Sequence, residues 1–330
     1  MSSRIVFMGT PDFAVPTLRV LSERIPRQHL LVVTQPDRAS GRGRRLQAPP
    51  VKQHAVDYGL DVVQVETLKD SSIRERITTF QPDLIIVAAF GLVLSRWVLE
   101  LPTYGCINLH ASLLPRFRGA SPIPAAIACG DETTGVAIMQ MERGLDTGGI
   151  YATHDEIIRA SDTTATLTAR LAETSGGLLK DQLRDLSRGA VTPVPQLGKI
   201  VETRKIVKAH GSIDWAWSAE RVERHVRAMW PWPRAWTVSG DGNTVQVHKA
   251  SVEANAANEQ PGVVLHAEDR ILVATGDRWL RLDTIQLPGK QAQPSRNLLQ
   301  HPAFSAGARF DRGENFERPD PWIVETGHTN

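Results

Sequence analysis

The sequence predicts two domains: an α/β domain with a largely parallel sheet, and a smaller domain of short strands. Three observations support this prediction. The chain has 330 residues, more than one ordinary hydrophobic core accommodates. Its first half alternates short β-branched runs with longer stretches of helical spacing, which is typical of α/β sheets. The composition changes after Gly189, and short strands then follow one another closely.

Five runs in the first half are predicted to be buried parallel strands, because they are apolar throughout rather than alternating. They read RIVFMG, HLLVVTQ, DVVQV, LIIVAAF and GCINLH. Two later strands, TGVAIMQM and GGIYATHDEII, and a long helix ended by Gly189 complete the domain. Ligands bind beyond the carboxyl ends of parallel strands. We therefore expect Gly9, Phe90 and His110, each of which ends a strand, at one edge of the sheet.

The second half begins with a linker that contains two close prolines and several cations. A helix ended by Pro231 follows, and then short strands at the spacing of a small barrel or sandwich. The end of the chain is rich in charge and proline, so we expect it to be poorly ordered. The predicted division is a first domain at 1–189, a linker at 190–208, a second domain at 209–312 and a tail at 313–330.

Composition argues against several classes of protein. No apolar run approaches the roughly 18 residues that a membrane span needs, and the first residues are unlike a signal peptide. Cys106 and Cys129 have neither CxxC spacing nor a nearby His/Cys set, so we expect structural thiols and no metal site. These features predict a cytoplasmic protein, and the lack of an obvious interface helix favours a monomer.

The N-terminal stretch VFMGTPDFAVPTL looks like a nucleotide-binding turn but lacks GxGxxG. Gly9 alone is a weak signal. Thr10 as a helix N-cap, with Pro11 at the first helical position, explains the segment without a ligand. We therefore favour a structural role for it.

A cationic loop is predicted between Thr34 and Lys52, where arginines are interleaved with glycines and prolines and Asp37 is the only acid. Such a run is most often a solvated surface loop without a helix or strand. This one leaves the carboxyl end of a strand, so contact with a phosphate backbone is the favoured hypothesis. The cations concerned are Arg38, Arg42, Arg44, Arg45 and Lys52.

The stretch INLHASLLPRFRG carries the most direct chemical signal. Residues two apart in an extended segment project to the same side, so Asn108 and His110 present an amide and an imidazole to one point. Such a pair can stabilise an oxyanion in acyl transfer. Asp146, in MQMERGLDTGGI, is a candidate carboxylate to orient or charge the histidine. A lone histidine at a strand end is more often structural, but the asparagine and the Asp loop together favour catalysis.

The sequence lacks the motifs of serine hydrolases, zinc proteases and P-loop nucleotide-binding proteins. The sequence contains no GxSxG elbow, no HExxH zinc motif and no Walker A loop. A non-covalent transfer, with the acyl group supplied by a bound donor, is the mechanism left.

At this point the sequence shows a family resemblance. INLHASLLPRFRGASPIPAAI together with GVAIMQMERGLDTGGI resembles the signature of the 10-formyltetrahydrofolate-dependent formyltransferases. IVFMGTPDFAVPTL, TQPDRASGRGRRL and SIDWAWSAERVERHVRAMWPWPRAWT are similar to the members of this family that act on methionyl-tRNA. The likeness extends from about residue 4 to about residue 300.

The resemblance implies a Rossmann-like catalytic domain joined by a basic linker to an OB-like barrel. It also implies transfer of a formyl group from 10-formyltetrahydrofolate to the methionine of initiator methionyl-tRNA, without a metal. The residues that match the family's catalytic trio are Asn108, His110 and Asp146. Those that match its folate-binding segments are Ser112, Leu113, Leu114, Pro115, Phe90, Gly91, Leu92, Val93 and Leu94. Those assigned to tRNA binding are Arg38, Arg42, Arg44, Arg45, Lys199, Arg204, Lys205 and Lys208.

Some positions depart from the family pattern. Phe90 and Phe117 stand where Tyr and Trp are common, and Trp230 stands where Asn is common. The tail beyond Gly313 has no counterpart. These differences concern individual contacts rather than the reaction.

Two other functions stay open on the sequence alone. A formyl-folate enzyme that acts on a small amine shares the Asn/His/Asp site but has no need of the basic loop, the linker or the second domain. A non-enzymatic RNA-binding protein is compatible with the barrel and the basic linker, but it leaves NLHASLLP and GLDTGG unexplained.

Overall fold

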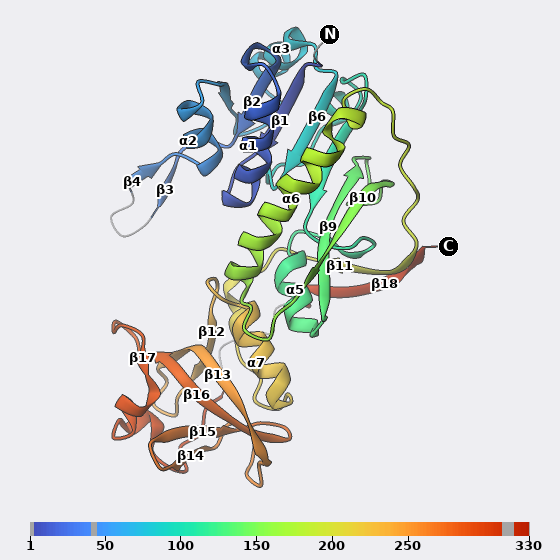
Figure 1. Ribbon diagram of the computed structural model, residues 1–330. Coiled ribbons are helices and arrows are strands. Elements are labelled where there is room, and N and C mark those ends of the chain that lie inside the picture. The colour runs from blue at the N-terminus through green and yellow to red at the C-terminus, as the bar shows by residue number, and fades with distance from the viewer. Residues whose placement is uncertain (1–2, 41–44, 312–319, 330) are drawn as a thin grey trace.

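The computed structural model describes residues 3–40, 45–311 and 320–329, and shows an α/β domain followed by a smaller domain of strands (Figure 1). The central sheet of the first domain has the order β10-β9-β7-β6-β1-β2-β5. Its first five strands along the chain pair in parallel, and the last two are antiparallel. The predicted, largely parallel sheet is therefore confirmed. Its strands are β1 (Ile5–Gly9), β2 (Leu30–Thr34), β5 (Asp61–Gln64), β6 (Leu84–Ala88), β7 (Cys106–His110), β9 (Thr133–Gln140) and β10 (Ile150–Ile157).

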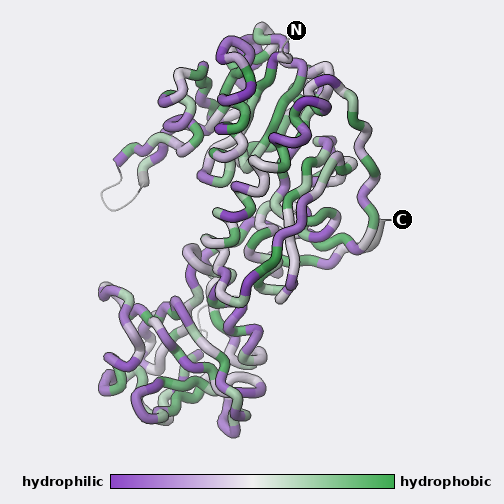
Figure 2. The backbone as a smooth tube through the Cα atoms, in the orientation of Figure 1, coloured by the Kyte–Doolittle hydropathy of each residue, from purple (hydrophilic) through white to green (hydrophobic). Residues whose placement is uncertain are grey.

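Both faces of the sheet are buried at its centre, where successive side chains of β1, β2 and β6 enter two different hydrophobic clusters. Ile5 and Phe7 belong to one cluster, whereas Val6 and Met8 belong to the other. Figure 2 shows the hydrophobic residues concentrated along these strands. The helices that pack on the first face are α1 (Val15–Arg24), α2 (Pro50–Asp57) and α6 (Thr164–Leu186). Those on the second face are α3 (Ser71–Phe80) and α4 (Arg96–Leu99).

The long helix α6 starts beside the second domain and runs along the sheet away from it (Figure 1). It begins with a capping box in which Thr163 and Thr166 satisfy each other's backbone N–H groups. At its other end, Gly189 takes the positive φ of 65° that the prediction required. Its buried side chains recur at helical spacing and include Leu167, Leu171, Leu179, Leu183 and Leu186.

A second, three-stranded sheet joins the linker and the tail to the first domain. Its strands are β8 (Arg116–Gly119), β11 (Gly198–Thr203) and β18 (Ile323–Thr329), in the order β18-β11-β8. Residues 198–203 of the predicted linker therefore form a strand, which is hydrogen-bonded to β8 directly after the NLHASLLP stretch. The expectation of a poorly ordered tail is wrong for residues 323–329, because they pair antiparallel with β11.

The cationic loop was expected to hold no strand, and this expectation is wrong at its two flanks. β3 (Arg38–Ser40) and β4 (Arg45–Gln47) pair antiparallel, and we call these two strands the basic hairpin. Arg42 and Arg44 lie outside the described residues.

The second domain is an antiparallel, barrel-like sheet in the order β12-β13-β16-β15-β14. Residues 307–311 close it, because their backbone bonds to Val264 and Gly262 on one side and to Val238 on the other. The helix α7 (Ala219–Ala228) precedes the sheet, as predicted. The strands are β12 (Ala235–Val238), β13 (Thr244–Ala256), β14 (Val264–Ala267), β15 (Arg270–Ala274), β16 (Arg278–Gln286) and β17 (Gln293–Pro294). The described part of the chain also contains the 3-10 helices η1 (Asp12–Ala14), η2 (Arg27–His29), η3 (Lys208–Gly211), η4 (Ser295–Leu298) and η5 (Pro302–Phe304).

The two domains meet where α7 approaches the start of α6 and the helix α5 (Pro122–Cys129). The Thr164 hydroxyl donates to the Ala228 carbonyl at 2.7 Å, and Arg227 donates to the Asp162 carbonyl at 2.9 Å. None of the helices in the described ranges combines the length and hydrophobicity of a membrane span.

Candidate active site

Strand β7 positions the first two candidate catalytic residues. Ile107 and Leu109 enter the core beneath α6, while Cys106 enters the opposite core. Asn108 and His110 therefore share the face opposite α6, as the alternation of a strand requires. Asn108 is half-buried and His110 is 6% exposed.

The hydrogen bonds of His110 decide which of its nitrogens can exchange a proton. Its Nε2 lies 2.9 Å from the Phe117 carbonyl oxygen. A carbonyl only accepts, so Nε2 carries a hydrogen in every protonation state compatible with this bond. The other nitrogen, Nδ1, faces Asp146 Oδ2 at 3.6 Å. Nδ1 is thus the atom through which the imidazole can gain or lose charge.

Asp146 reaches His110 because the chain folds back after β9. The end of β9 lies beside the start of β7, where the Met141 N–H donates to the Cys106 carbonyl. The following residues 144–149, here called the Asp146 turn, return to His110. The Gly119 N–H donates to Asp146 Oδ2 at 2.7 Å. Asp146 has a φ of 50°, a left-handed conformation that is strained for a residue with a Cβ.

The segment between β7 and β8 is held in place by its own hydrogen bonds and packing, and it positions the Phe117 carbonyl beside His110. The Ser112 hydroxyl donates to the Arg116 carbonyl at 2.7 Å, and Leu114 packs with Ala137 and Met139. Phe117 has a φ of 60°, which turns its carbonyl toward His110. Within the predicted folate segment, Ser112, Leu114 and Pro115 are buried, whereas Leu113 is half-buried and lies close to Gly135.

The 90–94 loop follows β6 and is anchored at both ends. Phe90 and Leu94 are buried in the core, and Gly91 has a φ of 82°. Leu92 is half-buried, and Val93 is 94% exposed. Val93 therefore projects into solvent at the carboxyl edge of the sheet, where ligands of such sheets bind.

The expectation for Thr10 was wrong in its detail. Pro11, not Thr10, occupies the N-cap position of η1, and α1 begins only at Val15. The Thr10 hydroxyl instead donates to the Phe90 carbonyl at 3.0 Å. Thr10 therefore has a structural role, but it stabilises the 90–94 loop rather than a helix.

Gln35 links the 90–94 loop to the basic hairpin. Its Nε2 donates to the Phe90 carbonyl at 2.8 Å, and its Oε1 accepts from Arg38 at 2.9 Å. Next to it, Lys52 donates to Asp37 at 2.8 Å, and this hydrogen bond lowers the pKa of the Asp37 carboxyl. Arg38 and Arg45 are exposed and available to a polyanion.

The four linker cations differ in their pairing. Lys199 lies 2.6 Å from Glu325, and Arg204 lies 3.4 Å from Asp320, so acids of the tail offset two of them. Lys205 and Lys208 are exposed beyond β11. The tail thus modulates the charge of the linker, which the sequence did not indicate.

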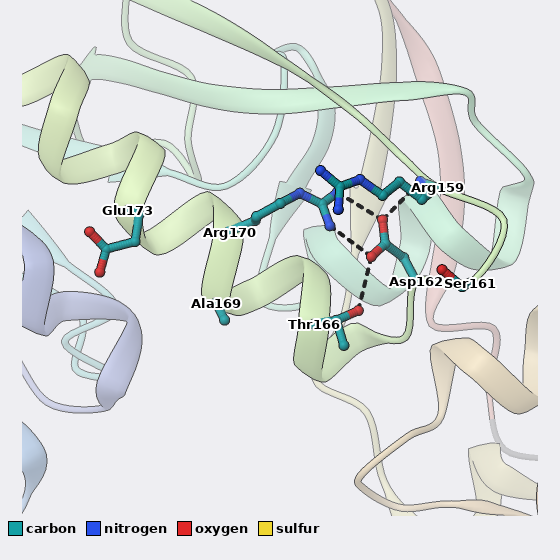
Figure 3. Close-up of a pocket in the computed structure, with 7 residues that line it drawn as sticks. All are labelled: Arg159, Ser161, Asp162, Thr166, Ala169, Arg170 and Glu173. Atoms are coloured by element: carbon teal, nitrogen blue, oxygen red, sulfur yellow. Dashed lines mark hydrogen bonds and ion pairs between the residues drawn. The ribbon is translucent and has the colours of Figure 1, made fainter.

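A hollow of about 480 Å³ lies away from these residues, at the start of α6 (Figure 3). Burial raises the pKa of Asp162 there, but hydrogen bonds from Arg170, the Arg159 N–H and Thr166 outweigh it, and the pKa falls to about 2. Since Arg227 of α7 also binds the Asp162 carbonyl, we interpret this cluster as a support for the domain junction. Its lining residues are Arg159, Ser161, Asp162, Thr166, Ala169, Arg170 and Glu173.

The described ranges contain no group of three or more His, Cys, Asp or Glu side chains placed to hold a metal ion. Cys106 is buried, and burial raises the pKa of its thiol to about 12. Cys129 is exposed, so the expectation of a packed structural thiol is wrong for that residue.

Sequence comparisons give the class of protein that this fold and site define. Residues 3–183 match the family described as formyl transferase, and residues 205–302 match the family described as formyl transferase, C-terminal domain. A sugar 3N-formyl transferase has the same fold, with a TM-score of 0.63, 16% identity, and coverage of 88% of this chain and 100% of that one. HypX from Aquifex aeolicus, in complex with tetrahydrofolic acid, gives a TM-score of 0.59 at 18% identity, covering 100% of this chain and 51% of that one.

More similar relatives identify the family within that class. The methionyl-tRNA formyltransferase of Marinobacter nauticus is 44% identical over 298 residues, which are 90% of this chain and 95% of that protein. That of Thermodesulfovibrio yellowstonii is 38% identical over 307 residues, 93% of this chain and 98% of that protein. That of Magnetococcus marinus is 41% identical over 313 residues, 94% of this chain and 99% of that protein. The chain belongs to the methionyl-tRNA formyltransferase family of formyl-transferring enzymes.

Proposed function

We propose that this protein transfers a formyl group from 10-formyltetrahydrofolate to the amino group of methionine on initiator methionyl-tRNA, for translation initiation in the cytoplasm. The observation that carries the proposal is the geometry at His110, whose imidazole lies between the Phe117 carbonyl and the Asp146 carboxylate on the strand that presents Asn108. The chemistry that this arrangement supports is acyl transfer through an oxyanion.

In this mechanism, the methionyl amine attacks the formyl carbon and the carbonyl oxygen takes up negative charge. The Asn108 amide donates a hydrogen bond to that oxygen, and His110 stabilises it as an imidazolium, since only the cation has a hydrogen on Nδ1 while Nε2 donates to Phe117. Collapse of the intermediate breaks the bond between the formyl carbon and N10 of the folate.

Asp146 handles the proton that the amine loses. Its Oδ2 already accepts from the Gly119 N–H, so Oδ1 is the oxygen that accepts the amine proton through a water. The same water returns this proton to N10 as the carbon–nitrogen bond breaks. Atoms and charge therefore balance without a metal.

The formyl donor supplies an activated one-carbon group, and the residues near the site fit such a ligand. The 90–94 loop offers the exposed Val93 beside the catalytic face, held in place by bonds from Thr10 and Gln35 to the Phe90 carbonyl. The Ser112–Pro115 segment directly follows His110 and contributes its backbone and the half-buried Leu113. We assign folate binding to these two segments.

The acceptor tRNA would contact the cations beside this edge. Arg38 and Arg45 of the basic hairpin are exposed and adjoin the 90–94 loop through Gln35. Lys205 and Lys208 are exposed between β11 and the second domain and supply further positive charge there. Arg42, Arg44, Lys199 and Arg204 complete the proposed tRNA contacts. We infer that the protein works as a monomer.

The direct test is transfer of a labelled formyl group from 10-formyltetrahydrofolate to methionylated initiator tRNA, with elongator tRNA and free methionine as parallel acceptors. We expect the label on the initiator alone. Label on a small amine but on no tRNA would contradict the proposed acceptor, and binding of tRNA without any transfer would contradict the enzyme.

A further inference from the structure

One buried glutamine connects the linker to the candidate active site. Gln196 lies two residues before β11 and is 5% exposed. Its Nε2 donates to the Asp146 carbonyl at 2.7 Å and to the Gly148 carbonyl at 2.8 Å. Arg118 of β8 donates to its Oε1 from Nε at 3.0 Å and from Nη2 at 2.7 Å.

These contacts fix the orientation of the Gln196 carboxamide. A guanidinium has only donors, so the oxygen must face Arg118 and the amino group must face the two carbonyls. Both amide hydrogens and both lone pairs of the oxygen are then used. A carboxamide with no remaining hydrogen-bonding capacity does not serve a ligand, but it does hold the groups that it bonds.

The groups it holds belong to the Asp146 turn. The strained φ of 50° at Asp146 persists only where surrounding bonds maintain it. Linker residues before Gln196 also lie along this turn, because Ile150 and Val194 exchange backbone hydrogen bonds at 2.7 and 2.8 Å. The Asp146 carboxylate in turn accepts from Gly119, the residue after Arg118. The bonds therefore form a closed circuit from Arg118 through Gln196 and Asp146 back to β8.

We propose that Gln196 is a positioning residue for formyl transfer, which holds the Asp146 turn so that its carboxylate stays beside His110 Nδ1. This inference rests on the proposed function. Gln196 does not touch the reacting atoms; it acts through the main chain of Asp146 and Gly148. Since Gln196 precedes the proposed tRNA-binding cations Lys199 and Arg204 on the same segment, the linker has a part in both acceptor binding and catalysis.

The test uses Gln196→Glu, which keeps the size of the side chain. Its carboxylate can still accept from Arg118, and as an ion pair, but it has no hydrogens to donate to the carbonyls of the turn. We expect kcat to fall about 10- to 100-fold, as for an ångström-scale misplacement of a catalytic group, while KM for either substrate changes less than about threefold.

The second domain provides a matched control. Arg234 donates to Gln286 Oε1 at 3.0 Å, and Gln286 Nε2 donates to the Lys290 carbonyl at 2.7 Å. Gln286→Glu therefore makes the same chemical change in a glutamine that also accepts from an arginine and donates to a carbonyl, but in the second domain and away from Asp146. We expect its kcat to stay within about twofold of wild type.

A double-mutant cycle separates positioning from general structural support. If Gln196 acts through Asp146, Gln196→Glu should cause no further loss of single-turnover rate in an Asp146→Ala background. Equal losses in both backgrounds would overturn the inference, as would a wild-type kcat in Gln196→Glu.

If the Glu variant did not fold, Gln196→Asn, which keeps the amide but shortens the side chain, would take its place in the cycle. If the wild-type protein transferred no formyl group, both the proposed function and this inference would be wrong. If the wild type were active but the losses of rate in the two single variants added up in the double variant, only this inference would be wrong.

Discussion

The Asp146 turn and the basic hairpin lie near the same site but are held in different ways. The turn is fixed through its main chain by a buried glutamine and through its carboxylate by a backbone N–H. The hairpin has two strands of three residues, and the side-chain contacts that hold it lie at its base, where Gln35 contacts Arg38 and Asp37 contacts Lys52. Leu46 near its end is 75% exposed.

This difference follows from what each region has to do. Proton transfer and oxyanion stabilisation require groups held within a fraction of an ångström, so the turn needs bonds that leave it little freedom. Attraction between a guanidinium and phosphates acts over several ångströms and tolerates movement. We therefore expect changes in the turn to lower kcat, and changes in the hairpin to weaken tRNA binding and alter its salt dependence.

The largest effects are expected when the catalytic trio is truncated. Asn108→Ala, His110→Ala and Asp146→Ala should each lower kcat by about 10²- to 10⁴-fold, the range for a lost oxyanion donor or general acid–base group. Their losses should not add, because the three groups act on one intermediate. The measurement is single-turnover formyl transfer at saturating substrates. Near-normal rates in all three folded variants would show that the reaction takes place elsewhere.

A smaller and different effect is expected in the hairpin. Arg45→Ala should raise KM for tRNA about three- to tenfold and reduce the slope of log affinity against log salt by about 1, with kcat and folate binding unchanged. Arg184→Ala, which removes an exposed arginine from the end of α6, serves as the matched control. If Arg45→Ala altered folate affinity alone, the assignment of the hairpin to tRNA would be wrong.

Patterns of neighbouring residues in the sequence predicted the features that depend on neighbouring residues, namely the strands and the side chains that share one face of a strand. Continuous apolar runs located the strands of the main sheet, and the two-residue repeat placed Asn108 and His110 on one face. The sequence also indicated Asp146, because glycines flank it in a segment that follows a strand.

The remaining features depend on contacts between distant segments, which no local pattern encodes. Gln196 lies 50 residues from Asp146 in the chain and was included in a segment that looked like a linker. The strand β18 forms where β11 offers an edge and where Trp322 and Ile323 pack beside Phe117 and Val201. Thr10 met every local criterion for a helix cap, yet its hydroxyl binds the Phe90 carbonyl, 80 residues away. A proline-containing segment with no helical or strand pattern carried no sign that a buried carboxamide just after Pro195 would hold an aspartate.

The smallest expected effect concerns Gln35, and it would show whether the proposed folate-binding loop and the basic hairpin depend on each other. Gln35 contacts both the 90–94 loop and Arg38, so Gln35→Leu removes the two hydrogen bonds that join the proposed folate and tRNA sites, while Thr10 still holds the Phe90 carbonyl. One net hydrogen bond is worth about 1 kcal/mol, so KM for folate and for tRNA should each rise about two- to fivefold with kcat unchanged. Gln53→Leu, which removes a glutamine whose side-chain amide donates to the Ala48 carbonyl, controls for the loss of an amide near the hairpin. If KM rose for one substrate alone, Gln35 would support only one of the two segments. The 90–94 loop and the basic hairpin would then bind their substrates independently of each other.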